Sequence, residues 1–310
     1  MEKRAIEFNF AVLFSIIVGA IIIFLAIYSS FKVIHTGTSE QESSLTKQLT
    51  IIFDPMETGI ASGKYSSVSF SENSRIYNEC SNEGEFGYQR FSFSTYSLGK
   101  WGEKNLGQKI NNKYVFSEKV EEGKKAYLFS KPFNFPFKVS ELIFFTTKTY
   151  CFQNAPDFIK DEVTSMEIQN IKLGNCSSSD IKVCFGTGSC DIKVIPKCNN
   201  DCGDFSEYEY GEVIKSNKTL TYYSDSLLYA AIFSSPEIYT CNVNRLMKRL
   251  ASQAELLGKE SYYVSTKCGV IPREDLLKLS SSALSSSLQE TGKLAKEINE
   301  KNNAASCELW

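Results

Sequence analysis

The strongest constraint on this chain is an uncharged apolar run near its start. The stretch "FNFAVLFSIIVGAIIIFLAIYSSF", Phe8–Phe31, holds 24 residues without Asp, Glu, Lys or Arg. As a helix rising about 1.5 Å per residue, it would be roughly 36 Å long, enough to cross a bilayer core of about 30 Å. The run is longer than the apolar core of a cleaved signal peptide, and no Ala-x-Ala-like site ends it. It therefore predicts an uncleaved transmembrane helix over residues 8–34.

Charges and cysteines predict on which side of the membrane the chain lies. Lys3 and Arg4 precede the apolar run and Lys32 alone follows closely, so the positive-inside bias predicts a cytoplasmic tail over residues 1–7. The ten cysteines all lie beyond the run, and an even count there predicts disulfides in an oxidising compartment. The disulfide candidates are Cys80, Cys151, Cys176, Cys184, Cys190, Cys198, Cys202, Cys241, Cys268 and Cys307. We expect a single-pass protein of the cell membrane with its bulk outside.

Two smaller patterns add candidate sites. Asn175 and Asn217 each begin an N-x-S/T sequence and are candidates for glycosylation on the outside. Ala11, Ser15 and Gly19 recur every fourth residue, and such small residues let helices approach closely in lipid. The expected partners are a lipid bilayer and either further copies of the chain or other surface proteins.

Charge and histidine content exclude several functions. A net charge of −2 and a pI near 5.8 give no basic field for nucleic-acid phosphates, so no nucleic-acid partner is expected. His35 is the only histidine and borders the apolar run, which disfavours Ser-His-Asp, Cys-His and HExxH chemistry. We therefore predict no catalytic residues and no cofactor, and a protein that is not an enzyme.

The start of the chain also resembles known families. "KRAIEFNFAVLFSIIVGAIIIFLAIYSSF" resembles the opening of uncharacterised single-pass membrane-anchored surface proteins of small-genome archaea and, more distantly, of archaeal type IV pilin-like proteins. The second resemblance implies a short basic leader, matched by Lys3, Arg4 and Ala5, and a helix that packs into a filament core. Glu7 looks like the family's glutamate, although cleavage after Ala5 would leave it at the second mature position rather than the fifth.

The rest of the chain predicts an α+β exterior domain. Residues 35–48 are polar and predict a stalk, while residues 49–223 contain short segments of alternating Phe, Tyr and β-branched residues, typical of a mainly antiparallel sheet. Most of these aromatic side chains are expected in the core, with a carbohydrate-stacking surface as the alternative. Residues 224–310 predict helices packed on the sheet. One is expected to end at Gly258, before a short strand over 262–265, and the last to begin at Pro272.

A repeated tetrapeptide, "DIKVCFGTGSCDIKV" over residues 180–194, predicts an antiparallel β-hairpin. Pairing Ile181 with Val194 and Val183 with Ile192 places the apolar residues on one face. A disulfide between Cys184 and Cys190 would close the loop, and zinc is the alternative for these cysteines. None of the nearby spacings is C-x2-C, which counts against zinc.

An acidic turn, "NNDCGDFSEYEYGE" over residues 199–212, contains candidate ligands for calcium. Asp201, Asp204 and Glu207 supply the hard oxygen ligands that Ca²⁺ prefers. The stretch lacks the full calcium-loop pattern, and a solvated acidic turn is the alternative.

These observations predict a membrane-anchored cell-surface protein with a structural, adhesion or interaction role. One alternative is a pilin-like subunit of a surface filament, which the resemblance implies. The other is a carboxylate-dependent hydrolase of surface glycans, which would need two acidic side chains about 5–10 Å apart across one cleft.

Overall fold

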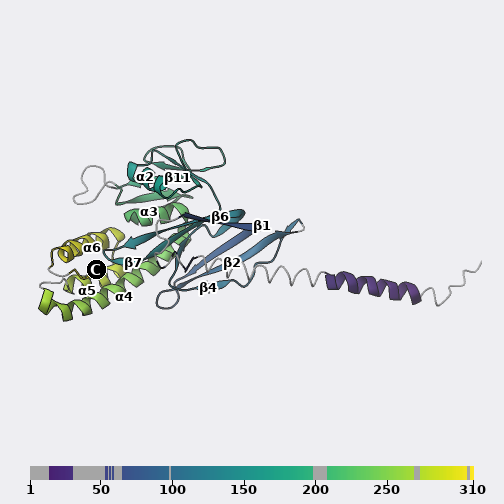
Figure 1. Ribbon diagram of the computed structural model, residues 1–310, viewed down its shortest axis with the longest axis horizontal. Coiled ribbons are helices and arrows are strands. Elements are labelled where there is room, and N and C mark those ends of the chain that lie inside the picture. Colours follow the sequence, from purple (N-terminus) through teal and green to yellow (C-terminus); the bar gives the residue numbers. More distant parts are fainter. Residues whose placement is uncertain are drawn as a thin grey trace, which may run out of the picture.

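The computed structural model describes residues 14–30, 53, 54, 56, 58, 65–97, 99–197, 208–268, 273–305 and 308–310. The described chain is α+β, with two mixed sheets and three disulfides. In Figure 1 the helices of the C-terminal third gather beside the larger sheet, and the smaller sheet lies on the other side of one buried helix.

The larger sheet is formed by the first half of the body. Its strands are β1 (Tyr65–Ser81), β2 (Tyr88–Ser97), β3 (Lys100–Trp101), β4 (Gln108–Ile110), β5 (Tyr114–Phe116), β6 (Val120–Asn134) and β7 (Lys138–Thr146). They lie in the order β3-β2-β1-β6-β7-β5, with β4 also paired to β2. Neighbours are antiparallel except β5 and β7, which are parallel.

The smaller sheet contains both strand directions. Its strands are β8 (Tyr150–Gln153), β9 (Ile171–Leu173), β10 (Ile181–Phe185), β11 (Ile192–Pro196), β12 (Tyr210–Lys215) and β13 (Lys218–Tyr223), in the order β13-β12-β11-β10-β8-β9. The pairs among β8, β9, β10 and β11 are parallel, and the pairs β11-β12 and β12-β13 are antiparallel. The expectation of a mainly antiparallel domain is therefore wrong for this sheet.

β7 separates two hydrophobic cores. Because side chains alternate along a strand, Leu142 and Phe144 lie in the core shared with the helices and the smaller sheet. Ile143 and Phe145 lie in a second core on the opposite face of the larger sheet. Every residue of β7 after its first is buried, so this strand reads as a continuous apolar run rather than an alternating one.

The five described helices of the body cover the shared core. They are α2 (Asp157–Ser165), α3 (Ser224–Phe233), α4 (Pro236–Cys268), α5 (Arg273–Ser285) and α6 (Leu288–Asn303). α3 is buried from Ser226 to Phe233 and contacts both sheets, which explains why residues 227–233 are a continuous apolar run. α6 begins with a capping box in which Ser287 and Glu290 bond each other's backbone amides.

A helical turn ahead of β1 fills the second core. Phe53 and Met56 are 1% and 3% exposed, and the Phe53 ring meets Phe91 of β2 with centroids 5.5 Å apart. Asp54 forms an ion pair with Lys113, 2.8 Å away. The apolar segment "LTIIF" over residues 49–53 predicts a buried strand, but Phe53 is helical, and residues 49–52 lie outside the described residues.

The predicted transmembrane helix over residues 8–34 is wrong as stated. The described helix covers residues 14–30, and among the described parts of the chain no helix is both long and apolar enough to span a membrane. At about 1.5 Å per residue it reaches roughly 26 Å, less than the approximately 30 Å of a bilayer core. Residues 8–13 and 31–34 lie outside the described residues.

The predicted hairpin over the repeated tetrapeptide is also wrong. β10 and β11 run parallel, with Val183 opposite Ile192 and Phe185 opposite Val194. The alternation of apolar residues places them on one face whether the two strands pair parallel or antiparallel. It therefore could not distinguish a parallel pair from a hairpin. The connection over residues 186–191 is shorter than the dozen or more residues usual between parallel strands.

The C-terminal helices differ from the expected boundaries. α4 begins at Pro236 and continues through Gly258 and residues 262–265, where a strand was expected. Proline at the first helical position loses no hydrogen bond, so Pro236 suits the start of α4. The segment after Pro272 forms two helices rather than one, because Ser287 caps a new helix.

Candidate functional site

The first half of α4 carries polar side chains that are buried against the free edge of β5. The carbonyl of Val115 accepts hydrogen bonds from the side-chain amides of Asn78 (3.2 Å), Gln89 (2.8 Å) and Asn242 (2.9 Å). The Val115 N–H donates to the side-chain oxygen of Gln89, 2.8 Å away. Side chains from β1, β2 and α4 therefore close an edge that would otherwise leave backbone groups unpaired.

Arg245 completes this buried polar cluster. Its side chain is fully buried and donates to the carbonyls of Phe86 (3.0 Å) and Lys113 (3.1 Å). The guanidinium also lies 4.7 Å from the centre of the Tyr114 ring. Burial lowers the pKa of Arg245 to about 10, so the group is still cationic at neutral pH. Its partners are neutral oxygens and a ring, which makes it a structural cation that ties α4 to the larger sheet.

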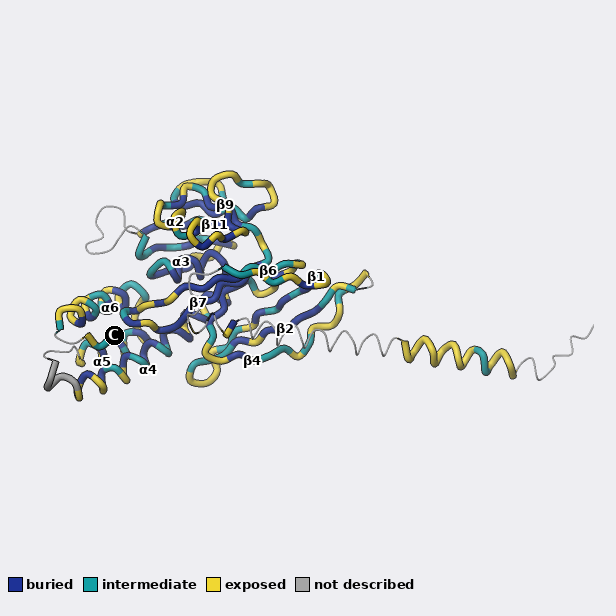
Figure 2. The backbone as a smooth tube through the Cα atoms, in the orientation of Figure 1, coloured by how far each residue is buried: buried dark blue, intermediate teal, exposed yellow. Residues whose placement is uncertain are grey.

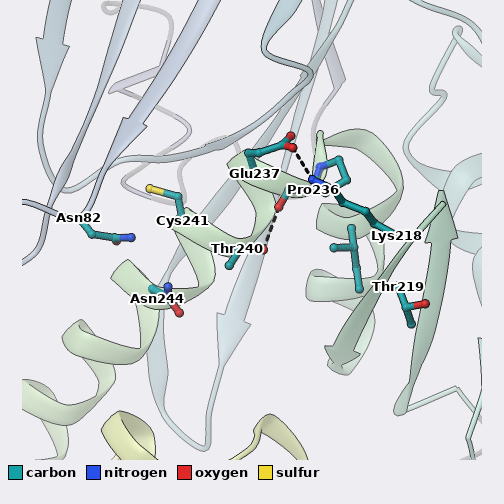
Figure 3. A pocket seen from close by; sticks show the side chains of 9 residues that line it. Asn82, Lys218, Thr219, Pro236, Glu237, Thr240, Cys241 and Asn244 are labelled. Atoms are coloured by element: carbon teal, nitrogen blue, oxygen red, sulfur yellow. Dashed lines mark hydrogen bonds and ion pairs between the residues drawn. The ribbon is translucent and has the colours of Figure 1, made fainter. Parts of the chain in front are cut away.

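Two surface hollows flank the disulfide above this cluster. The larger, about 550 Å³, is lined by Asn82, Lys218, Thr240 and Asn244 among others (Figure 3). The smaller, about 410 Å³, is lined by Cys80 of the Cys80–Cys241 bridge, whereas Cys241 lines the larger one. Both are open to solvent and contain charged groups, whose chemistry decides what the hollows can bind.

Glu237, at the start of α4, lines both hollows. Its carboxylate accepts a hydrogen bond from Lys218, 2.6 Å away, and lies 3.7 Å from Lys119. The hydrogen bond from Lys218, with help from the backbone at the helix start, lowers the pKa of Glu237 to about 2. A carboxylate held ionised in this way is a poor proton donor, so the hollows suit recognition of polar groups better than acid catalysis.

A second polar cluster joins both sheets beneath α3. Lys215 of β12 is buried and donates to Glu118 (3.0 Å) and to the carbonyls of Ile232 (3.0 Å) and Ser234 (2.8 Å) at the end of α3. Burial lowers the pKa of Lys215. Nearby Glu121 is fully buried, and desolvation raises the pKa of its carboxyl although Thr147 donates to it.

A third polar cluster lies between α2, α3 and β6. Lys131 of β6 is buried and contacts two carboxylates, Glu162 of α2 at 2.5 Å and Asp225 of α3 at 2.7 Å. The three charged side chains come from segments that are far apart in the sequence.

The structure pairs six of the ten predicted cysteines. The disulfides are Cys80–Cys241, Cys151–Cys176 and Cys184–Cys190. The predicted disulfide-bonded character of the chain is thus confirmed for these six. Cys198, Cys202 and Cys307 lie outside the described residues, as does the side chain of Cys268.

The other predicted site residues are scattered. Asn175 and Asn217 are exposed, the second in the tight turn between β12 and β13. The calcium candidates Asp201, Asp204 and Glu207 lie outside the described residues, as does Ala11 of the helix-packing set. Ser15 and Gly19 lie on the helix over residues 14–30. The structure brings none of these described residues into one site.

Sequence reasoning missed the buried polar residues of all three clusters. A lysine inside the apolar stretch "YLFSKPFNF" was the one available signal for Lys131, because a buried lysine needs a partner. Arg245 gave no such signal on an amphipathic helix, where arginine is usually exposed.

Comparison with known proteins adds no relative: neither a family model, nor a curated protein, nor a solved structure matches this chain. The fold and the described sites therefore define the class of the protein, a disulfide-bonded α+β protein with two mixed sheets.

Proposed function

We propose that this chain is a structural or adhesive protein that works outside the cytoplasm and does not act on an external substrate. The observation that carries the proposal is the set of three disulfides, which tie together elements of both sheets and α4. Disulfides persist in oxidising compartments and are rare in the cytosol.

Two features of the candidate sites support a non-catalytic role. Two of the acidic side chains in the interior contact a lysine, Glu118 with Lys215 and Glu162 with Lys131. The charged groups of the surface hollows neutralise each other through Lys218 and Glu237. These arrangements stabilise the fold or bind polar groups, and they differ from two carboxyl groups facing an open cleft.

Mass spectrometry of the natively expressed protein tests this proposal. Alkylation without reduction, followed by proteolysis, is expected to leave the six paired cysteines unmodified and to yield peptides joined as Cys80–Cys241, Cys151–Cys176 and Cys184–Cys190. Alkylation of the same sample after reduction is the control for accessibility. Free thiols at these six positions in the native sample would contradict an oxidising location.

A second candidate function, a filament subunit, is favoured by the helix over residues 14–30. Its large apolar side chains are mostly exposed, with Phe24 at 67%, Ile23 at 62% and Ile22 at 60% (Figure 2). A contiguous exposed apolar surface of this kind marks an interaction site. We propose that helices from further copies of the chain cover it.

Charge substitution in the full chain tests the filament candidate. Phe24→Glu is expected to abolish assembly seen by light scattering and electron microscopy, because a carboxylate would be buried between helices. Leu106→Glu, at a loop residue that is 96% exposed, is the matched control and is expected to assemble normally. A wild-type chain that remains monomeric, or a Phe24→Glu chain that still assembles, would exclude this role.

A further inference from the structure

Lys131 is held between two carboxylates in the interior of the protein. Its side chain is 6% exposed, and its ammonium group lies 2.5 Å from Oε1 of Glu162 and 2.7 Å from Oδ2 of Asp225. The ring of Tyr229 covers it, with the nitrogen 4.5 Å from the ring centre. An amine, a carboxyl group that it can attack and a second carboxyl group therefore meet in one place.

The cluster is more than a simple ion pair. It has two carboxylates for one lysine. The second carboxylate, that of Glu162, also interacts with the hydroxyl of Tyr229. A group that can take and return a proton and a group that can donate a hydrogen bond therefore lie beside the amine.

We propose that Lys131 and Asp225 form an intramolecular amide bond, an isopeptide cross-link, with Glu162 as the proton carrier. The amine nitrogen lies 2.7 Å from Oδ2 of Asp225, so it is in direct contact with the carboxyl group that it attacks. The rigid β6 and α3 hold the two groups together, so the reaction is intramolecular and needs no added cofactor.

The reaction balances without a co-reactant. Glu162 takes one proton from the Lys131 ammonium and gives it to Asp225, which makes the amine nucleophilic and the carboxyl group electrophilic. The nitrogen then bonds to Cγ of Asp225, and Glu162 carries a second proton from the nitrogen to the departing oxygen. The C–O bond breaks and one water molecule leaves, so both protons lost by the nitrogen end on that oxygen. Asp225 has a side chain 46% exposed, which gives the water a way out.

Tyr229 is placed to stabilise the reaction. It follows Asp225 by one helical turn on α3, and the two side chains therefore share a face. Burial, and then the carboxylate of Glu162, raise the pKa of Tyr229 well above its usual value, so the hydroxyl keeps its proton. The ring of Tyr229 lies over the Lys131 nitrogen, and its O–H group can donate to the oxygen that becomes negative when the nitrogen attacks.

Intact mass measurement of the purified full chain tests the cross-link. The expected mass is that of the sequence minus the hydrogens lost in the disulfides and minus one water, and proteolysis should yield one branched peptide joining Lys131 to Asp225. Lys131→Arg and Asp225→Ala should each restore the missing water. Glu162→Gln and Tyr229→Phe should slow the loss of water after refolding. For Glu162→Gln the rate should fall about 100-fold, as expected on removing a general acid–base group.

Lys160→Arg is the matched control, since Lys160 and Asp157 form a Lys–Asp pair at a similar distance, 2.8 Å, on the surface. This variant should lose water as the wild type does. A wild-type chain at its full mass, with no branched peptide, would overturn the proposal even if every variant failed to fold. The loss of one water is measured separately from the state of the cysteines. A chain that is cross-linked but has free thiols would contradict the proposed function and still support the cross-link.

Discussion

Arg245 donates a hydrogen bond to the side-chain oxygen of Asn242, 2.7 Å away and one turn earlier on α4. Asn242 in turn donates to the carbonyl of Val115 on β5, so the two residues together connect the helix to the strand edge. Cys241, between them and the surface, is bonded to Cys80 of β1. The attachment of α4 to the larger sheet is therefore both covalent and polar.

Removing the amide of Gln89 should destabilise the fold. Gln89→Leu keeps the size of the side chain but leaves the buried N–H of Val115 without its acceptor, at a cost of about 1–3 kcal/mol. The free energy of unfolding in urea measures this loss. Gln169→Leu, at an exposed position, is the control and should change the free energy by less than about 0.5 kcal/mol. Equal effects of the two substitutions would show that the Val115 N–H does not depend on Gln89 for its hydrogen-bond acceptor.

The three disulfides should contribute unequally to stability. In the chain-entropy account, the Cys80–Cys241 bridge, with a sequence separation of 161, contributes about 5 kcal/mol, and the Cys184–Cys190 bridge, with a separation of 6, about 2 kcal/mol. Paired Cys→Ser variants compared by urea unfolding would measure both values. A larger loss for the short loop than for the long one would contradict this order.

Asp180 should make stability depend on acid pH. The carboxylate accepts from the backbone of Ser177 (2.7 Å) and from Lys172 (2.9 Å), and the hydrogen bonds from Ser177 and Lys172 lower its pKa from 3.8 to about 2. Because the folded pKa is below the unfolded value, this stabilisation is complete above about pH 4 and is lost as the pH falls towards 2. The difference in unfolding midpoint between wild type and Asp180→Asn should therefore shrink over that range. A difference that stays constant between pH 6 and pH 2.5 would contradict the assignment.

Substitutions on the two faces of β7 should both destabilise the whole body. Phe144→Ala opens a cavity in the shared core and Ile143→Ala one in the second core, with costs of about 3–5 and 2–5 kcal/mol. Leu106→Ala, at an exposed loop residue, is the control and should be nearly neutral. Unfolding followed by tryptophan fluorescence and by circular dichroism should give the same midpoint for each variant. Separate transitions would show that the two cores unfold independently.

Much of the strand content could be predicted from the sequence. The alternation in "YQRFSFSTY" and "TLTYY" corresponds to β2 and β13, and the Phe-rich segment before Thr146 corresponds to β7. The direction of strand pairing could not, because alternation is the same in parallel and antiparallel neighbours. That is why the repeated tetrapeptide was misread.

The candidate sites were largely beyond prediction for a different reason. Disulfides and buried ion pairs join residues that are distant in sequence, as Lys131 and Asp225 are. Local sequence patterns do not predict which of these residues come into contact. The cysteine count predicted that bridges form but not which cysteines pair. Apolar composition alone does not set where a helix begins and ends, and the described N-terminal helix covers residues 14–30.

The bridge between Cys80 and Cys241 also determines how the body would respond to a mechanical pull. If tension is applied between the two ends of the chain, the force passes from β1 directly into α4 through the sulfur atoms. The residues between the two cysteines form a closed loop that cannot be extended while the bond is intact. Both sheets, apart from most of β1, are in that loop, so a pulled molecule would lengthen only in its N-terminal segment and its C-terminal helices.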